Sequence, residues 1–243
     1  MADWVVWGVR PVEEALEAGV PVQTLYVLRG ADKRLGRLVA LARERGAKVV
    51  EVTREVLDGY SSGHQGVVLL LSPVELVDWK EVLKGVRNRG EVPLFLALDG
   101  VEDVGNLGAI IRSAEALGVH GLLLPKRRSA PLTPAVAKAS SGALFHLPIS
   151  RVTNLARTMK EMKEDGMWVV GTHLEGSMEP WKVDFSLPVV LVMGNEEKGL
   201  SRLVKEACDF LVRIPMVGRV ESLNVSAATA VLLYEALRQR LSP

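Results

Sequence analysis

From Val92 to the end of the chain, short apolar segments alternate with amphipathic ones, and this alternation restricts the possible folds more than any other feature. The apolar segments have the length of strands, the amphipathic ones have the spacing of helices, and Gly or Pro residues separate them. Such an alternation is typical of a parallel sheet with crossover helices. The sequence therefore predicts an α/β domain with five or six parallel strands. Five of these strands are expected at "PLFLALDG", "GLLLP", "MWVVGTH", "PVVLVMG" and "FLVRIPM".

The predicted helices of this region are "NLGAIIRSAEALG", "PAVAKASSGAL", "VTNLARTMKEMKEDG", "SRLVKEAC" and "SAATAVLLYEALRQR". The first is bounded by Asn106 and Gly118, and Asn106 is a candidate for its N-cap. The last is preceded by Ser222, Asn224 and, in its first turn, Ser226. One Ser or Asn is enough to cap a helix. The surplus of polar groups raises the possibility that some of these side chains face a ligand.

The first 73 residues read as a smaller α/β unit. Its predicted strands are "VQTLYVLRG", "KVVEVT" and "GVVLLLS", and its predicted helices lie in "WGVRPVEEALEAG", "RLGRLVALARERG" and "REVLDGYS". Residues 74–91 read as a helical connector that ends in a charged turn. We therefore expect an N-terminal domain at 1–73, a linker at 74–91 and a C-terminal domain at 92–243.

Composition narrows the class of protein. Cys208 is the only cysteine, which excludes a disulfide framework and a cysteine metal site. The four histidines are scattered without the spacing of metal ligands, so no metal is expected. No apolar run reaches the length of a membrane span, and the N-terminus lacks the pattern of a signal peptide. These features predict a cytoplasmic protein without a membrane contact.

The net charge of +1 is uninformative, but the basic residues are unevenly distributed. One cluster comprises Arg29, Lys33, Arg34 and Arg37, and a second comprises Lys126, Arg127 and Arg128. Charged side chains in loop-like segments are usually solvated and bind nothing. Each cluster, taken by itself, is best interpreted in this way. Loops also carry many binding residues, so both clusters are candidate contacts for a polyanion.

In an open parallel sheet, ligands bind beyond the carboxyl ends of the strands. The segments that follow the predicted strands are rich in Gly, small polar residues and carboxylates. Asn106 and Arg112 follow one strand, and Glu196 follows another within "MGNEEKGLS". No G-x-G-x-x-G and no phosphate-binding P-loop occurs in these segments, which makes a nicotinamide oxidoreductase a poor fit. On physical grounds Glu196 could equally stabilise a helix start or anchor a ligand.

Three segments together resemble the sequence motifs of the SpoU branch of the SPOUT RNA methyltransferases. They are "NLGAIIRSAEALG", "LVMGNEEKGLS" and "IPMVGRVESLNVSAATAVLLYEA", in the order and spacing of that family. The N-terminal segments "VWGVRPVEEAL" and "GHQGVV" resemble the RNA-substrate-binding domain often fused to it. The segments "PKRRSAPLTPAVAKASSGA" and "RVTNLARTM" resemble those of bacterial 23S rRNA guanosine 2′-O-methyltransferases.

The resemblance implies a deep C-terminal trefoil knot, a homodimer and S-adenosylmethionine as methyl donor. It also implies roles for individual residues. Thr172, Gly194, Ile214 and Leu223 would contact the cofactor. The active-site positions would be Asn106, Arg112, Glu196, Ser222 and Asn224. Both basic clusters become candidates for RNA contact, because phosphates are recognised by Lys and Arg.

Methyl transfer to a ribose 2′-hydroxyl requires positioning of that hydroxyl and removal of its proton. A guanidinium has no acceptor, so we expect Arg112 to stabilise alkoxide charge or to clamp the adjacent phosphate. We expect Glu196 to order its loop and the Asn224 amide. The alternatives are a tRNA or other rRNA ribose methyltransferase, a resistance-type adenosine methylase, and a non-catalytic RNA-binding protein. The N-terminal domain argues against the tRNA enzymes, which usually carry helical extensions instead. The polar motif positions Asn106, Arg112, Glu196, Ser222 and Asn224 are all present, which argues against a non-catalytic protein.

Overall fold

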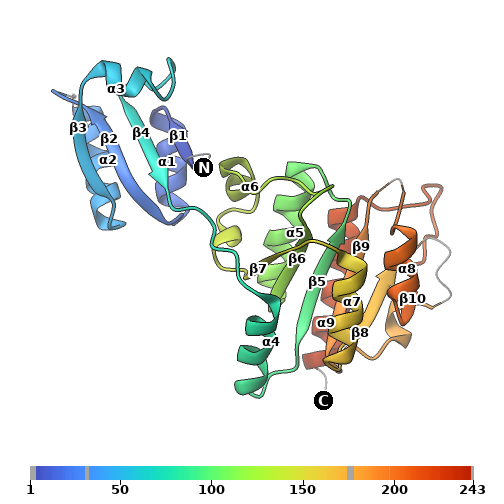
Figure 1. The fold of residues 1–243 in the computed structure, drawn as a ribbon. Helices are drawn as coiled ribbons and strands as arrows, with labels where there is room; N and C mark the ends of the chain where they lie inside the picture. The colour runs from blue at the N-terminus through green and yellow to red at the C-terminus, as the bar shows by residue number, and fades with distance from the viewer. Residues whose placement is uncertain (1–3, 31–32, 174–177, 197, 242–243) are drawn as a thin grey trace. The chain divides into compact units, whose positions relative to one another are not determined.

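The computed structural model describes residues 4–30, 33–173, 178–196 and 198–241 (Figure 1). The chain divides into two compact units. The first contains Met1–Val74 and Leu132–Phe145, and the second contains Glu75–Pro131 and His146–Pro243.

The first unit is built on a four-stranded sheet with the order β1-β4-β2-β3. The strands are β1 (Val5–Trp7), β2 (Val22–Leu28), β3 (Lys48–Val52) and β4 (Val67–Leu71). β4 pairs antiparallel with both β1 and β2, whereas β2 and β3 are parallel. The sequence did not predict β1, because three residues are too few to show a periodicity.

Helices α1 (Val9–Glu17) and α2 (Lys33–Glu44) supply the core of this unit, and the short α3 (Arg54–Asp58) follows β3. Val12 and Leu16 of α1 and Leu38 of α2 are buried together with the apolar side chains of β2 and β4. The predicted "PAVAKASSGAL" helix is shorter than expected. It comprises α6 (Pro134–Ala139) and the 3-10 turn η1 (Ala143–Phe145), and both are grouped with the first unit.

The second unit contains an all-parallel sheet of six strands with the order β10-β8-β9-β5-β6-β7. The strands are β5 (Leu94–Asp99), β6 (Gly121–Pro125), β7 (Ile149–Val152), β8 (Trp168–Thr172), β9 (Val189–Gly194) and β10 (Phe210–Val212). Every residue of β5 and β9 is buried, as expected for central strands covered on both faces. The short edge strand β7 was not predicted, and β10 is shorter than predicted.

Helices cover both faces of this sheet (Figure 1). One core contains side chains from α4 (Trp79–Asn88), α7 (Leu155–Glu164) and α8 (Arg202–Ala207). α5 (Val104–Ala116) and α9 (Val225–Leu241) pack against each other, and the short 3-10 turn η2 (Pro180–Lys182) contacts α9. α4 lies in the expected linker, but Trp79 and Leu83 are buried in the core of the second unit. This segment is therefore a packed helix and not a free connector.

The strand order reverses direction at the β5–β9 pair. From β5 the chain proceeds outward through β6 and β7, and it then returns to the opposite side through β8, β9 and β10. In open parallel sheets, ligands bind at such a reversal, beyond the carboxyl ends of the strands. After β10 at the sheet edge, the chain runs to α9 beside α5. Near the end of α9, Arg240 donates hydrogen bonds to the carbonyl oxygens of Val92 and Pro93, which precede β5.

Candidate active site

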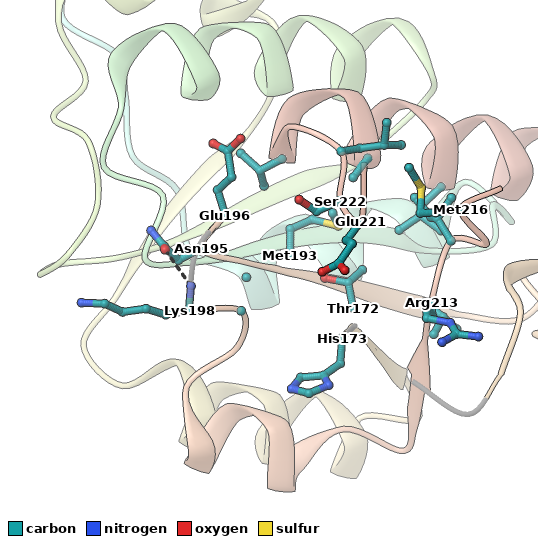
Figure 2. Close-up of a pocket in the computed structure, with 18 residues that line it drawn as sticks. Thr172, His173, Met193, Asn195, Glu196, Lys198, Arg213, Met216, Glu221 and Ser222 are labelled. Carbon is teal, nitrogen blue, oxygen red and sulfur yellow. Dashed lines mark hydrogen bonds between the residues drawn. The ribbon is translucent and has the colours of Figure 1, made fainter. Parts of the chain in front are cut away.

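A cavity of about 380 Å³ lies beyond the carboxyl ends of β8, β9 and β10 (Figure 2). Its walls come from the ends of these strands, the loop that follows β9, the segment between β10 and α9, and the first turns of α9. β9, one of the two strands at the reversal, thus ends at the cavity. Its size falls within the range of small-molecule sites.

The structure brings the expected cofactor residues together at this cavity. Thr172, Gly194, Ile214 and Leu223 all line it, and so do Glu196 and Ser222. Thr172 ends β8, and its hydroxyl donates a hydrogen bond of 3.3 Å to the carbonyl oxygen of Val192. Glu196 lies on the opposite side of the cavity from Arg213 and Met216 (Figure 2). Five charged or polar lining residues were not predicted as site residues, and each flanks a predicted position or lies within a motif: His173, Asn195, Lys198, Arg213 and Glu221.

Gly194 is required by the closeness of the loop that follows it. A Cβ built on Gly194 would lie 2.3 Å from the carbonyl carbon of Gly199 and 2.5 Å from the nitrogen of Leu200. Any side chain at this position would displace the loop. The glycine is therefore explained by backbone packing in addition to its place in the cavity wall.

Asn195 orders the loop between β9 and α8. Its side-chain nitrogen donates to the carbonyl oxygen of Gly100 at 2.9 Å, and its side-chain oxygen accepts from the N–H of Lys198 at 3.1 Å. Its backbone also exchanges two hydrogen bonds with Gly199. The expectation that Glu196 orders this loop and the Asn224 amide is wrong. The Glu196 carboxylate is exposed and forms no hydrogen bond or ion pair within the described residues.

Asp99 anchors the far end of the same loop. This residue ends β5 and is buried, and its carboxylate accepts a hydrogen bond of 2.7 Å from the N–H of Ser201. The loop is thus attached to the end of β5 at two points, through Gly100 and through Asp99. Sequence reasoning missed both Asn195 and Asp99, although each directly follows or ends a predicted strand.

Asn106 and Asn224 meet at the helix starts. The Asn224 side-chain nitrogen donates to Asn106 Oδ1 at 2.9 Å. The Asn224 oxygen accepts from the N–H and the hydroxyl of Ser226, which makes Asn224 the N-cap of α9. Asn106 does not cap α5. That cap is Asp103, whose carboxylate accepts from the N–H of Asn106 at 2.6 Å. The Asn106 side chain is therefore held beside Asn224 and is not used as the cap of α5.

Arg112 is exposed on α5 and forms no ion pair with any residue that the structure describes. It does not line the cavity of its own chain. Six residues separate it from Asn106, which corresponds to about 9 Å along the helix and a rotation of about 240°. Arg112 and the Asn106–Asn224 pair therefore point away from α5 in different directions.

The cavity fits a ligand with an apolar ring and polar substituents. Ile214, Leu223, Val225 and Leu232 supply apolar surface. The backbone N–H groups of Ile214 and Leu223 form no hydrogen bond with any described residue, so they remain available to a ligand. Carboxylates of Glu196 and Glu221 supply negative charge, and Lys198 and Arg213, which also line the cavity, supply positive charge. This donor and acceptor set suits a nucleoside that carries charged substituents.

The basic residues differ in their environments. Arg37 forms ion pairs with Glu13 at 3.5 Å and with Glu17 at 3.3 Å, so its charge is balanced on the first unit. Arg29 is exposed, and so are Lys126, Arg127 and Arg128 in the segment after β6. Lys33 and Arg34 begin α2, but their side chains lie outside the described part of the chain.

Nowhere in 4–30, 33–173, 178–196 or 198–241 do three or more His, Cys, Asp or Glu side chains gather in a way that could hold a metal ion. No helix within these ranges combines the length and the apolar character needed to cross a membrane.

Comparison with known proteins identifies both parts of the chain. Residues 93–234 match the sequence profile of the SpoU rRNA methylase family. Residues 5–77 match the profile described as RNA 2′-O ribose methyltransferase substrate binding. A Bacillus subtilis protein named as a TrmH family tRNA/rRNA methyltransferase, YacO, is 44% identical over 98% of this chain and 96% of its own length.

Solved structures agree with these matches. The SpoU methyltransferase AviRb from Streptomyces viridochromogenes, in complex with AdoMet, has a TM-score of 0.72 and 34% identity, covering 98% of this chain and 91% of its own. An AdoMet-bound rRNA methyltransferase from Sinorhizobium meliloti has a TM-score of 0.69 and 32% identity, covering 99% and 88%.

A TrmH/SpoU tRNA modifying enzyme from A. aeolicus has a TM-score of 0.57 and 35% identity, and it covers only 66% of this chain and 83% of its own. The chain belongs to the SpoU (TrmH) family of RNA methyltransferases.

Proposed function

We propose that this protein transfers a methyl group from S-adenosylmethionine to the ribose 2′-oxygen of a guanosine in 23S rRNA. The observation that carries the proposal is the convergence of the three motif segments on one cavity beside the Asn106–Asn224 pair. Because its substrate is ribosomal RNA, we place the enzyme in the cytoplasm.

Ribosomal RNA is favoured over tRNA by the two-unit architecture. The N-terminal unit matches a profile for RNA 2′-O ribose methyltransferase substrate binding. The AdoMet-bound rRNA methyltransferase from S. meliloti matches over 99% of this chain, whereas the tRNA modifying enzyme from A. aeolicus matches over 66%. The N-terminal unit thus accompanies the rRNA enzyme in these comparisons. The segments "PKRRSAPLTPAVAKASSGA" and "RVTNLARTM" favour guanosine in 23S rRNA.

The cofactor is S-adenosylmethionine, which supplies an electrophilic methyl group when bound. We assign its site to the cavity of about 380 Å³. The N–H groups of Ile214 and Leu223, which donate to no residue that the structure describes, would bind the polar edge of the adenine, while apolar side chains contact its faces. Glu221 and Glu196 would favour the positively charged sulfonium portion. The close packing of Gly194 against Gly199 and Leu200 keeps the loop wall of the cavity in place.

The remaining polar residues would hold the RNA. Asn106 and Asn224 fix each other across the two helix starts, and Ser222 lies in the cavity wall two residues before Asn224. This places hydrogen-bonding groups where a ribose hydroxyl would approach the methyl donor. Arg112 would stabilise the developing alkoxide or clamp the adjacent phosphate, because a guanidinium can donate but cannot accept a proton.

We propose that the protein is a homodimer whose interface includes α9. An exposed stripe at helical spacing runs along this helix: Ala227, Val231, Tyr234, Arg238 and Leu241. Tyr234 is 62% exposed and Leu241 is 73% exposed, which is unusual for large apolar side chains in one row. A second copy of the chain would cover them. Arg112, which is exposed and does not line its own cavity, would then act in the partner's site.

We further propose that the C-terminal segments form a trefoil knot. The chain leaves β10 at one edge of the sheet and must cross beyond the ends of β8 and β9 to reach α9 beside α5. The β9–α8 loop, attached to the end of β5 through Asn195 and Asp99, lies in the same region. This course of the chain supports threading of α9 past that loop.

The test is methyl transfer with radiolabelled S-adenosylmethionine to separate unmodified transcripts of 23S rRNA, 16S rRNA and tRNA. We expect label in 23S rRNA. Label in tRNA or 16S rRNA alone would overturn the proposed substrate. An absence of label in every RNA, combined with RNA binding, would favour a non-catalytic RNA-binding protein.

A further inference from the structure

Arg151 holds the segment that follows β6. This residue lies in the edge strand β7, and its half-buried guanidinium donates to three acceptors. These are the carbonyl oxygen of Pro125 at 2.9 Å, the hydroxyl of Ser129 at 3.1 Å and the carbonyl oxygen of Ala130 at 3.0 Å. Burial lowers the pKa of Arg151 from its usual value, in keeping with a partly dehydrated position. One side chain thus connects both ends of a six-residue segment, 125–130.

Backbone hydrogen bonds fix the same segment at two further points. The N–H of Lys126 donates to the carbonyl oxygen of Val152, and the N–H of Ala130 donates to that of Val101, each at 2.9 Å. Between these anchors, Arg128 has a φ of 57°, in the left-handed region that non-glycine residues rarely adopt. Such a conformation persists only where the surrounding contacts impose it, and it is most frequent at functional sites.

The constrained backbone directs Arg128 towards the cavity edge. A Cβ built on Gly100 would lie 3.5 Å from Arg128 Nη2 and 3.4 Å from the Cβ of Asn195. Gly100 follows β5, and Asn195 precedes Glu196 of the cavity wall. The Arg128 guanidinium therefore lies against the loops that carry the candidate active site. It forms no ion pair with any residue in the described ranges and is exposed.

We propose that Arg128 binds an RNA phosphate beside the target nucleotide and that Arg151 is the positioning residue that holds Arg128 there. A guanidinium that has no ion-pair partner among the described residues, lies beside the loops of the site and has a fixed backbone suits bidentate recognition of a phosphate. Lys126 and Arg127 also carry positive charge in this segment. We assign the phosphate contact to Arg128 because the left-handed conformation and the contact with Gly100 belong to that residue. This inference rests on the proposed function.

The test compares Arg128→Ala, Arg151→Met and the double variant in binding and methylation of an unmodified 23S rRNA transcript. We expect Arg128→Ala to weaken RNA binding about tenfold and to reduce the salt dependence of binding by about one phosphate contact. Affinity for S-adenosylmethionine should not change. Lys160→Ala, which removes an exposed charge from α7, is the matched control.

Arg151→Met should reproduce the Arg128→Ala result, including the altered salt dependence, because the segment loses the three hydrogen bonds that hold it. The double variant should bind RNA no more weakly than Arg128→Ala alone. A loss of packing elsewhere would not change the salt dependence in this way. Ser129→Ala, which removes one of the three bonds, provides a milder variant and should give an intermediate effect.

The outcomes separate this inference from the proposed function. A wild-type protein that neither binds nor methylates the transcript would overturn both. A wild-type protein that methylates it, while Arg128→Ala behaves like Lys160→Ala, would overturn this inference alone. If the double variant lost RNA affinity by the product of the two single-variant factors, Arg151 would not act through Arg128. That result would overturn the positioning role of Arg151.

Discussion

The Asn224 side chain bonds to Asn106 on α5 at 2.9 Å while its oxygen caps α9 through Ser226. The two asparagines are 118 residues apart in the sequence. One amide group thus fixes a helix start and connects it to another segment of the candidate site. Asn224 therefore has two functions, the cap of α9 and the bond to Asn106, and substitution can separate them. A serine hydroxyl can cap the helix but cannot replace the amide that bonds to Asn106.

Asn224→Ser should keep a cap on α9 but lose the bond to Asn106, whereas Asn224→Ala should lose both. We expect Asn224→Ala to lower the free energy of unfolding by about 1 kcal/mol relative to Asn224→Ser. Both variants should methylate RNA at least roughly tenfold more slowly, because the site is less well positioned. Thermal denaturation and single-turnover methylation measure the two effects. Wild-type turnover in Asn224→Ser would contradict the assigned site role.

Arg112→Lys should keep a positive charge but lose the bidentate geometry of a guanidinium. We expect kcat to fall on the order of a hundredfold, as for loss of a transition-state donor. Affinity for S-adenosylmethionine, measured by calorimetry, should be unchanged because Arg112 does not line the cavity. Near-wild-type turnover of Arg112→Lys would contradict the proposal that Arg112 clamps the adjacent phosphate.

Mixed dimers test which protomer supplies Arg112. Arg112→Lys and Asn224→Ala protomers, unfolded together and refolded, should form dimers in which one site has both native residues if Arg112 acts in the partner. Random pairing would then restore roughly a quarter of wild-type activity. No restoration would show that Arg112 serves its own chain.

Val231→Glu with Tyr234→Glu should disrupt the proposed dimer, because two carboxylates would be buried without partners in the interface. Light scattering after size-exclusion chromatography should give the mass of a monomer. Leu203→Glu is the control, since this exposed residue lies on α8, away from the α9 stripe. A monomeric wild-type protein would contradict the proposed assembly.

Cys208 provides a prediction about pH. Burial, followed by the charge of Asp209, raises the pKa of the thiol to about 12. The native state therefore favours the neutral thiol, and this contribution to stability is complete below the pKa of an unfolded cysteine. It should be lost as the pH rises from there towards about 12. Cys208→Ala should lose less stability than the wild type between pH 9 and 11, as measured by denaturant unfolding.

Alkylation gives an independent readout of the same group. At pH 8 the thiolate fraction of native Cys208 should lie on the order of a thousandfold below that of an exposed cysteine. Iodoacetamide should therefore modify the protein only after unfolding. Rapid modification of the native protein would show that the thiol is not protected.

Most of the second unit follows from its sequence, because long apolar segments such as "PVVLVMG" have one good structural interpretation, a central strand. The missing elements were short. β1 and β7 are held by pairing with strands distant in sequence, and three or four residues carry no period. Asp103 was overlooked as the cap of α5 because Asn106 three residues later offered the same chemistry.

The candidate site was predictable where residue type and motif agree, as at Gly194 and Asn224. Roles that depend on tertiary contacts were not. No sequence pattern indicates that Asn195, rather than Glu196, orders the β9–α8 loop, because its partner Gly100 lies 95 residues away. The same applies to Arg151, whose acceptors at 125–130 lie more than 20 residues away along the chain.

Methylation of a ribose 2′-oxygen can be measured directly. Nucleosides from a 23S rRNA transcript methylated by the wild-type protein are analysed by mass spectrometry, and the alkali-resistant bond is mapped. We expect a single 2′-O-methylguanosine, which blocks alkaline cleavage at one position. Methylation of a base, with every phosphodiester bond still cleaved by alkali, would contradict it.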